Sequence, residues 1–202
     1  MSQSNVEAIQ TEVMDIFPTS IHDEMEWDSL FEILMRKAVS QGAYCRCYAQ
    51  LCQFLSQHIS SFAPSFLPYC QNHVEKHLQR LLKCKPTPIT SSEGIGLSRF
   101  LGELHSFQLI DETLLHSYVN TLFDLFRTNS STQIEQFEVL LESINQLVLC
   151  FLQYGEISPQ PSFITPNHWD LLQDKCNQNN IPSRYRFKLM DLFDKYDSTQ
   201  KK

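Results

Sequence analysis

The stretch from Gly96 to Phe126, GLSRFLGELHSFQLIDETLLHSYVNTLFDLF, predicts two amphipathic helices joined by a very short turn. At about 100° per residue, the apolar side chains of the first helix share one arc: Leu97, Phe100, Leu101, Leu104 and Phe107. Ser98, Gly102 and Ser106 form a separate ridge of small residues, which lets another helix approach closely. Such an approach explains why the helix tolerates a central glycine, which costs about 1 kcal/mol relative to alanine. We therefore expect this helix to be packed on two sides, with Arg99 and Glu103 on its third side as a weak charge pair.

The turn between these two helices carries its own signals. Asp111 is a natural N-cap for the second helix, and Glu112 in the first turn is favoured by the helix dipole. Ile110 and Leu115 stand at the positions of a hydrophobic staple across that cap. These residues indicate a hairpin that serves packing, since none of them suggests catalysis.

Apolar residues recur at helical spacing along almost the whole chain, and no alternating pattern predicts a strand. Further helices are predicted at 4–17, 27–40, 43–59, 64–83, 132–153, 167–179 and 182–196. Pro, Gly and Ser accumulate in two segments, 85–96 and 154–169, which we interpret as interruptions. Thr165 followed by Pro166 is a typical helix start. The fold class is therefore all-α, with stacked antiparallel helical hairpins.

Composition narrows the classes of function. The chain has 202 residues, 42% of them hydrophobic, and a net charge of −7, which argues against strong binding of nucleic acids. No apolar run approaches the roughly 20 residues that span a bilayer, and the N-terminus lacks the pattern of a signal peptide. Seven cysteines without framework spacing indicate free thiols in a reducing compartment. We expect a cytoplasmic protein without membrane contact.

Metal and catalytic chemistry find little support in the sequence. Cys70, His73 and His77 follow a C-x2-H-x3-H spacing on a helix, but no second ligand pair stands at zinc-finger spacing. The glycines of EGIGLSRFLG (93–102) resemble a phosphate loop, yet the lysine and the preceding strand are missing. We predict no catalytic residues, no metal and no cofactor. A metal-dependent or thiol enzyme stays open as an alternative from a different class.

The last predicted helix carries an aromatic residue outside its apolar face. That face consists of Tyr185, Leu189, Leu192, Phe193 and Tyr196. Phe187 falls on the other side, among the charged residues Arg184, Lys188, Asp191 and Asp194. Such a phenylalanine either packs against a neighbouring helix or anchors a partner, because aromatic and arginine side chains dominate interface hot spots.

Three segments together resemble the middle domain of eukaryotic translation initiation factor 4G, the MIF4G-type HEAT-repeat domain. RFLGELHSFQLIDETLLHSYVNTLF (99–123) is similar to its phenylalanine-x-glycine-glutamate-leucine helix, turn and second helix. SRYRFKLMDLFD (183–194) resembles its late arginine-x-arginine-phenylalanine helix, and LFEILMRKAVSQGAYCRCYAQLCQFL (30–55) resembles its early hairpin. The segments occur in the family's order and cover most of the chain. The long charged insert that usually precedes the glycine-glutamate helix is replaced by KCKPTPITSSEGI (83–95).

The resemblance implies a crescent-shaped, HEAT-like α-solenoid that acts as a non-enzymatic adaptor in translation initiation. Its implied partner is a DEAD-box RNA helicase of the initiation factor 4A type, whose activity it would modulate. The helicase-binding motif of the family falls on Arg184, Arg186 and Phe187, with Arg99 and Glu103 as weaker surface candidates.

The resemblance also leaves alternatives within the same fold. Adaptors of the poly(A)-binding-protein-interacting or mRNA-decay type share it, and poly(A)-binding protein or other initiation factors are their partners. RNA contact would be weak or absent. We expect one domain at residues 27–197, an N-terminal segment at 1–26 with one helix, and a flexible tail at 198–202.

Overall fold

The computed structural model describes residues 24–83, 88–128, 134–154, 164–178 and 181–200. These residues contain eight α-helices, one short 3-10 helix and no strand. In chain order the elements are α2 (Glu24–Ser40), η1 (Gly42–Tyr44), α3 (Cys45–His58), α4 (Phe62–Lys83), α5 (Pro88–Ser106), α6 (Glu112–Thr128), α7 (Ile134–Tyr154), α8 (Pro166–Asn177) and α9 (Ser183–Gln200). The all-α prediction is confirmed.

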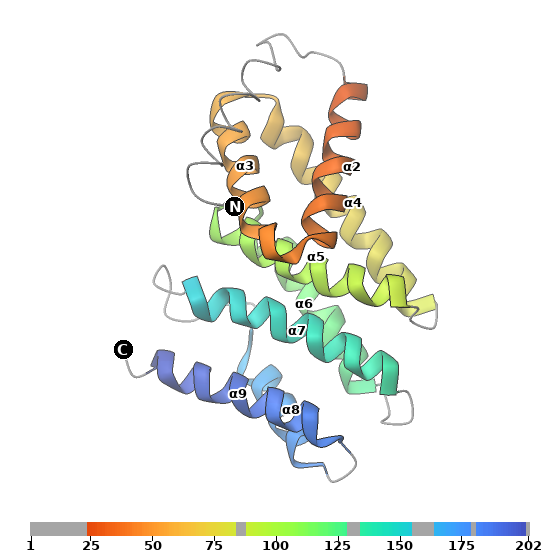
Figure 1. Cartoon of the computed structure of the whole chain (residues 1–202), viewed down its shortest axis with the longest axis vertical. Helices are drawn as coiled ribbons and strands as arrows, with labels where there is room; N and C mark the ends of the chain where they lie inside the picture. The colour runs from red at the N-terminus through yellow and green to blue at the C-terminus, as the bar shows by residue number, and fades with distance from the viewer. Residues whose placement is uncertain (1–23, 84–87, 129–133, 155–163, 179–180, 201–202) are drawn as a thin grey trace.

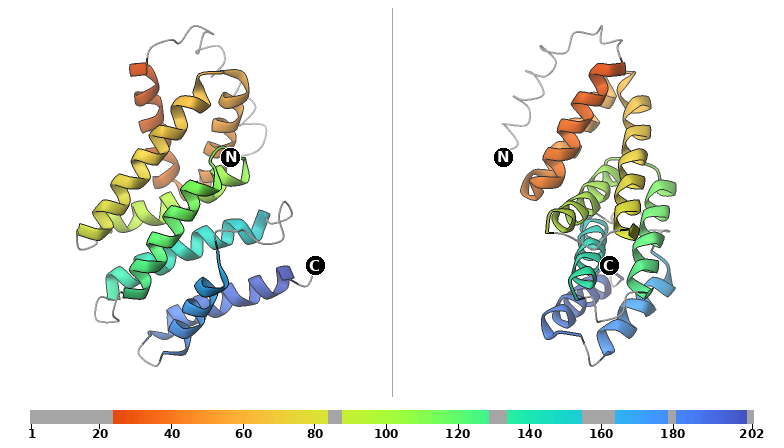
Figure 2. Two further views of the ribbon diagram at one scale, coloured as in Figure 1. Left: turned by 180° about the vertical axis from the view of Figure 1, so that it is seen from behind. Right: turned by 90° about the vertical axis from the view of Figure 1, so that its right-hand side faces the viewer.

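The helices form a stack of hairpins in two rows. Helices α5, α7 and α9 follow one another below α2 and α3 in Figure 1. The right-hand view of Figure 2 shows α4, α6 and α8 in a second row beside that of α5, α7 and α9. Helix α5 packs against α2, α3 and α7, and α9 packs against α7 and α8. This is the solenoid-like arrangement that the hairpin pattern predicted.

Aromatic clusters hold neighbouring helices of the stack together. At one end Trp27 and Phe31 of α2 lie 5.5 Å apart, and the ring of Phe31 meets that of Phe62 in α4 at 5.4 Å. Farther along the stack, the ring of Phe137 in α7 stacks on Phe126 of α6 at 4.9 Å. Because aromatic rings bury large apolar areas and pair specifically, these contacts fix α2 on α4 and α6 on α7.

Helix α5 begins earlier than the sequence indicated. Residues 85–96 were interpreted as an interruption, but α5 starts at Pro88 and runs without a break through Gly94 and Gly96. A Cβ atom at Gly96 would lie 2.0 Å from the carbonyl oxygen of Val39 in α2. The glycine that suggested a loop is instead required where two helices almost touch.

Of the predicted ridge of small residues, Gly102 is confirmed as a point of close helix approach. A Cβ atom at Gly102 would lie 2.7 Å from the Cβ atom of Cys150 in α7. Ser98 has a different role, since its hydroxyl group lies 2.8 Å from the hydroxyl group of Tyr118 in α6. Ser106 donates a hydrogen bond to the carbonyl oxygen of Glu103.

The turn between α5 and α6 is compact and hydrogen-bonded. Gln108 adopts a left-handed conformation (φ 59°). The N–H groups of Gln108 and Leu109 donate to the carbonyl oxygens of His105 (2.8 Å) and Leu104 (3.0 Å), as in a Schellman motif. Asp111 then accepts a hydrogen bond from the backbone N–H of Leu114 at 3.0 Å, which confirms it as the N-cap of α6.

Helix α8 starts as its sequence predicted. Thr165 precedes the helix in an extended conformation, and Pro166 is its first residue. The imidazole Nδ1 of His168 accepts a hydrogen bond from the N–H of Thr165 at 3.2 Å. A histidine therefore takes the position that glutamate or glutamine usually fills in a capping box.

The expected terminal segments lie partly outside the described residues. Residues 1–23, which include the predicted N-terminal helix, fall there, as do residues 201–202. Residues 198–200, assigned above to a tail, belong to the last turn of α9, where Ser198 donates to the carbonyl oxygen of Asp194. No helix within the described ranges is long and apolar enough to cross a bilayer.

Candidate partner-binding surface on the last helix

Helix α9 is fixed to the stack by one face. Tyr185, Leu189 and Leu192 are buried. The ring centroids of Tyr185 and Phe137 of α7 lie 5.9 Å apart in an edge-to-face contact. Those of Tyr196 and Trp169 of α8 lie 4.1 Å apart. The buried face thus follows the predicted apolar positions and leaves the opposite face of α9 to solvent.

The outer face of α9 carries two large apolar side chains. The side chain of Phe187 is 62% exposed, and that of Met190 is 48% exposed. They stand three residues apart on a helix, so they are neighbours on one face. This arrangement confirms that Phe187 lies off the core face. Exposed apolar side chains of this size lose water contact when a partner covers them.

Two ion pairs connect the edge of α9 to α7. The guanidinium group of Arg184 pairs with Glu138 and lies 4.6 Å from the ring centroid of Tyr185. The ammonium group of Lys188 pairs with Glu142. Burial raises the pKa of Glu142, but hydrogen bonds from Lys188 and Gln146 outweigh burial and leave the pKa below its usual value. Arg184 is thereby held beside Phe187 while remaining 65% exposed.

Arg186 has a different environment from Arg184. Its side chain is half-buried, and its Nη2 donates to the carbonyl oxygen of Gln178 at 3.1 Å. The carbonyl oxygen of Arg186 in turn accepts the thiol of Cys176, with 3.9 Å between the atoms. Of the three residues of the motif, Arg186 is therefore bound to the end of α8, whereas Arg184 and Phe187 face outward.

Arg99 and Glu103 do not join this surface, because α7 lies between α5 and α9 (Figure 1). Glu103 was expected on the surface, but only 3% of it is exposed. Its carboxylate pairs with Arg46 of α3 at 3.3 Å, and the Arg46 guanidinium lies 5.1 Å from the centroid of the Phe107 ring. The third side of α5 is thus covered by α3, while Arg99 is half-buried beside α2.

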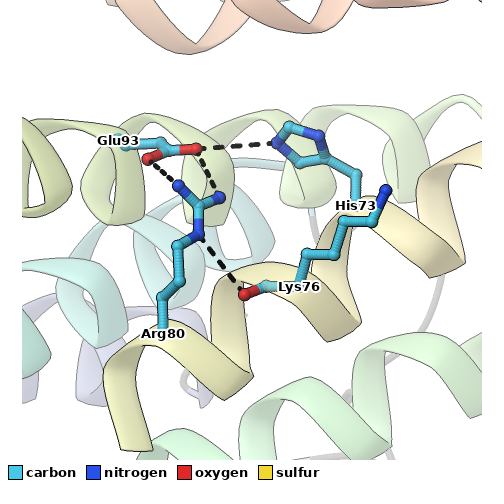
Figure 3. A network of polar contacts seen from close by, with 4 residues as sticks. All are labelled: His73, Lys76, Arg80 and Glu93. Atoms are coloured by element: carbon cyan, nitrogen blue, oxygen red, sulfur yellow. Dashed lines mark hydrogen bonds and ion pairs between the residues drawn. The ribbon is translucent and has the colours of Figure 1, made fainter. Parts of the chain in front are cut away.

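The C-x2-H-x3-H segment forms part of a helix–helix contact. Cys70 is fully buried in the core. Figure 3 shows the polar network next to His73, in which Arg80 of α4 donates to both carboxylate oxygens of Glu93 in α5, at 2.9 and 2.8 Å. The Nε2 atom of His73 lies 3.9 Å from the same carboxylate. In the described part of the chain, no three His, Cys, Asp or Glu side chains are arranged to hold a metal ion.

Burial also makes several thiols poor nucleophiles. It raises the pKa of Cys45, Cys52 and Cys70 far above the usual thiol value, and it raises that of Cys150 to about 12. Because the thiolate is the reactive form, these four side chains are unsuited to nucleophilic catalysis at neutral pH.

Sequence reasoning missed Met190, Glu138 and Glu142 as parts of this surface. Met190 stands three residues after Phe187 and could have been found by extending the helical wheel by one turn. The two glutamates belong to another helix, and their approach to Arg184 and Lys188 follows from the packing of α7 on α9.

Comparison with known proteins adds one match. The model of the MIF4G domain family matches residues 1–195. No curated protein matches the chain.

Proposed function

The chain belongs to the MIF4G domain family, whose members are protein-interaction domains in translation and RNA metabolism, and on this premise we propose that it binds a DEAD-box RNA helicase of the initiation factor 4A type. It would act as a non-enzymatic adaptor. The observation that carries the proposal is the exposed pair Phe187 and Met190 on the outer face of α9, with the cation of Arg184 at its edge.

The residues of this surface suit a protein partner. An aromatic ring and a methionine supply apolar area, and the flexible methionine adapts to the shape of the partner. Arg184 is already oriented by Glu138 and by the ring of Tyr185, so its ordering costs less entropy on binding. We expect Phe187 to be the central anchor and Arg184 to add specificity.

In the proposed mechanism, the adaptor controls how the two lobes of the helicase are placed relative to each other. A DEAD-box helicase has two lobes that must close on each other during ATP turnover. An adaptor that binds the helicase more tightly in one arrangement of the lobes shifts their equilibrium toward that arrangement. The rigid stack beneath α9 would let the chain act in this way without catalysing a reaction itself.

Titration of the full chain against the purified helicase tests the proposal. We expect Phe187→Ala to weaken binding by about tenfold or more, as a hot-spot residue does, and to leave the fold intact because the side chain is exposed. Ile33→Ala is the matched control, since Ile33 is an exposed apolar residue on α2. Unchanged affinity of the Phe187→Ala variant would refute α9 as the helicase-binding surface.

The alternatives give different outcomes in a pull-down from lysate. The pull-down could recover poly(A)-binding protein or decay factors in place of the helicase, and Phe187→Ala could abolish that recovery. This result would make the chain an adaptor of the poly(A)-binding-protein-interacting or mRNA-decay type. A metal assay on the purified protein tests the metal-dependent enzyme. An RNA titration tests the expectation that nucleic-acid contact is weak or absent.

A further inference from the structure

A groove of about 700 Å³ lies between α2, α4 and α5, away from the outer face of α9. Its partly exposed apolar side chains are Val39 of α2, Tyr69 of α4 and Ile95 of α5, and the buried Met35 lies beneath them. Gln146 of α7 also lines it. The groove is large enough for a few residues of a peptide, and it mixes apolar walls with polar groups as ligand sites do.

The cation of Arg99 lines this groove and forms no ion pair within the described part of the chain. The next acidic residue on its own helix, Glu103, pairs with Arg46. Among the described residues the Arg99 guanidinium has neither an ion pair nor a hydrogen bond. A half-buried guanidinium that lacks a partner has lost part of its hydration, so a carboxylate brought to it by a ligand gains a strong, bidentate contact.

Gly42 keeps the groove open beside this cation. A Cβ atom at Gly42 would lie 3.5 Å from Nη1 of Arg99, which is ordinary contact distance. A longer side chain at this position would therefore extend over the guanidinium group. The absence of a side chain at position 42 leaves Arg99 accessible from the groove.

The acidic residues of the groove decide which anion fits. Glu93 is neutralised by the two hydrogen bonds from Arg80 (Figure 3). Glu32 and Arg36 also line the groove with opposite charges, and the chain as a whole carries a net charge of −7. A polyanionic backbone such as RNA would be repelled, whereas a single carboxylate next to an apolar side chain would not.

We propose that this groove binds a segment of a partner protein in which an acidic residue stands beside an apolar one. The carboxylate pairs with Arg99, and the apolar side chain lies against Val39, Tyr69 and Ile95. The site is separate from α9, and the proposal does not depend on the helicase assignment.

The test is a selection of peptides from a random dodecapeptide library displayed on phage, with the full chain immobilised. We expect the enriched peptides to share an acidic residue adjacent to an apolar one. In titrations, Arg99→Gln should weaken their binding by about tenfold or more, since a charge-assisted contact is lost. Gly42→Leu, which covers the cation and retains it, should weaken binding as well. Arg127→Gln is the matched control: this arginine of α6 lies outside the groove, so the variant should bind these peptides like the parent chain.

Three results would overturn the proposal. The first is a failure of acidic recognition: the enriched peptides share no acidic residue, or they bind the parent chain and Arg99→Gln with equal affinity. The second is Arg99-dependent binding of an oligouridylate, which would make the groove a nucleic-acid site. The third is Arg99-dependent binding of a capped peptide of residues 4–17, which would make the occupant a segment of this chain. Loss of helicase binding in Phe187→Ala affects none of these readouts.

Discussion

Two glycines of α5 determine how closely this helix lies against its neighbours. A Cβ atom would lie 2.0 Å from a backbone oxygen of α2 at Gly96 and 2.7 Å from Cys150 at Gly102, whereas at Gly42 the nearest atom would be 3.5 Å away. We expect Gly102→Ala to lower the free energy of unfolding by about 1–3 kcal/mol despite the better helix propensity of alanine. Gly96→Ala should cost more, because the backbone of α2 cannot move aside as a side chain can.

Urea unfolding followed by circular dichroism checks this order, with Gly42→Ala as the matched control. The control should stay within about 0.5 kcal/mol of the parent chain. An alanine variant at Gly96 or Gly102 that is as stable as the parent would contradict the close approach of the helices.

His77 makes stability depend on pH. The side chain is 1% exposed and packs next to Gly94, where a Cβ atom would lie 3.1 Å from the imidazole. Neither ring nitrogen has a hydrogen-bond partner in the described part of the chain. Burial lowers the pKa of His77 from 6.5 to about 4. The unfolded chain therefore binds a proton below pH 6.5 that the folded chain binds only near pH 4.

The difference in proton binding decides in which direction the free energy of unfolding changes with pH. The free energy of unfolding should fall as the pH drops from 6.5 toward 4, by up to about 3 kcal/mol from this residue alone. His77→Phe should reduce the slope over that interval, and Ile33→Ala, which removes an exposed apolar side chain and no titratable group, should leave it unchanged. Denaturant titrations across this pH range measure the slope. An equal slope in His77→Phe and the parent would show that another group causes the acid sensitivity.

At the scale of elements, α3 and α5 are joined by a buried carboxylate. Glu103 is 3% exposed, while Arg46 reaches it from a half-exposed position. Arg46→Met keeps the apolar stem but removes the positive charge from beside the buried Glu103 carboxylate. It should lower the free energy of unfolding by about 1–3 kcal/mol. Adding Glu103→Gln should recover part of that loss, because the neutral amide needs no counter-charge. A double-mutant cycle by urea unfolding measures the coupling, and purely additive effects would argue against the pair.

The same helix shows what the sequence could and could not predict. Apolar periodicity predicted the helices and the outward position of Phe187, and residue type predicted the caps at Asp111 and Thr165. These features depend on residues close together in the sequence. The segment before Gly96 was misread, since glycine marks a loop and a close helix contact alike. Glu103 was placed on the surface because a helical wheel shows which side chains share a face. Only packing shows that α3 covers that face.

At the scale of the whole molecule, stability should be greatest in the middle of the stack. Helix α5 contacts helices on three sides, and α7 lies between α5 and α9. The last helix is supported mainly by α7 and α8 among the described elements, and Phe187 and Met190 on its outer face are exposed. In a stack of hairpins each layer is stabilised mainly by its neighbours, so the terminal layer should open first.

Hydrogen exchange followed by mass spectrometry measures this gradient. Amides of α5 and α7 should exchange about tenfold or more slowly than those of α9, because opening the middle of the stack disrupts two layers while opening α9 disrupts one. Binding of the helicase should then slow exchange in α9 most, since a partner on its outer face supplies the missing neighbour. Protection confined to α2 and α5 would place the partner at the groove and separate the two surfaces experimentally. Equal protection along the free chain would instead show that the stack opens as one cooperative unit.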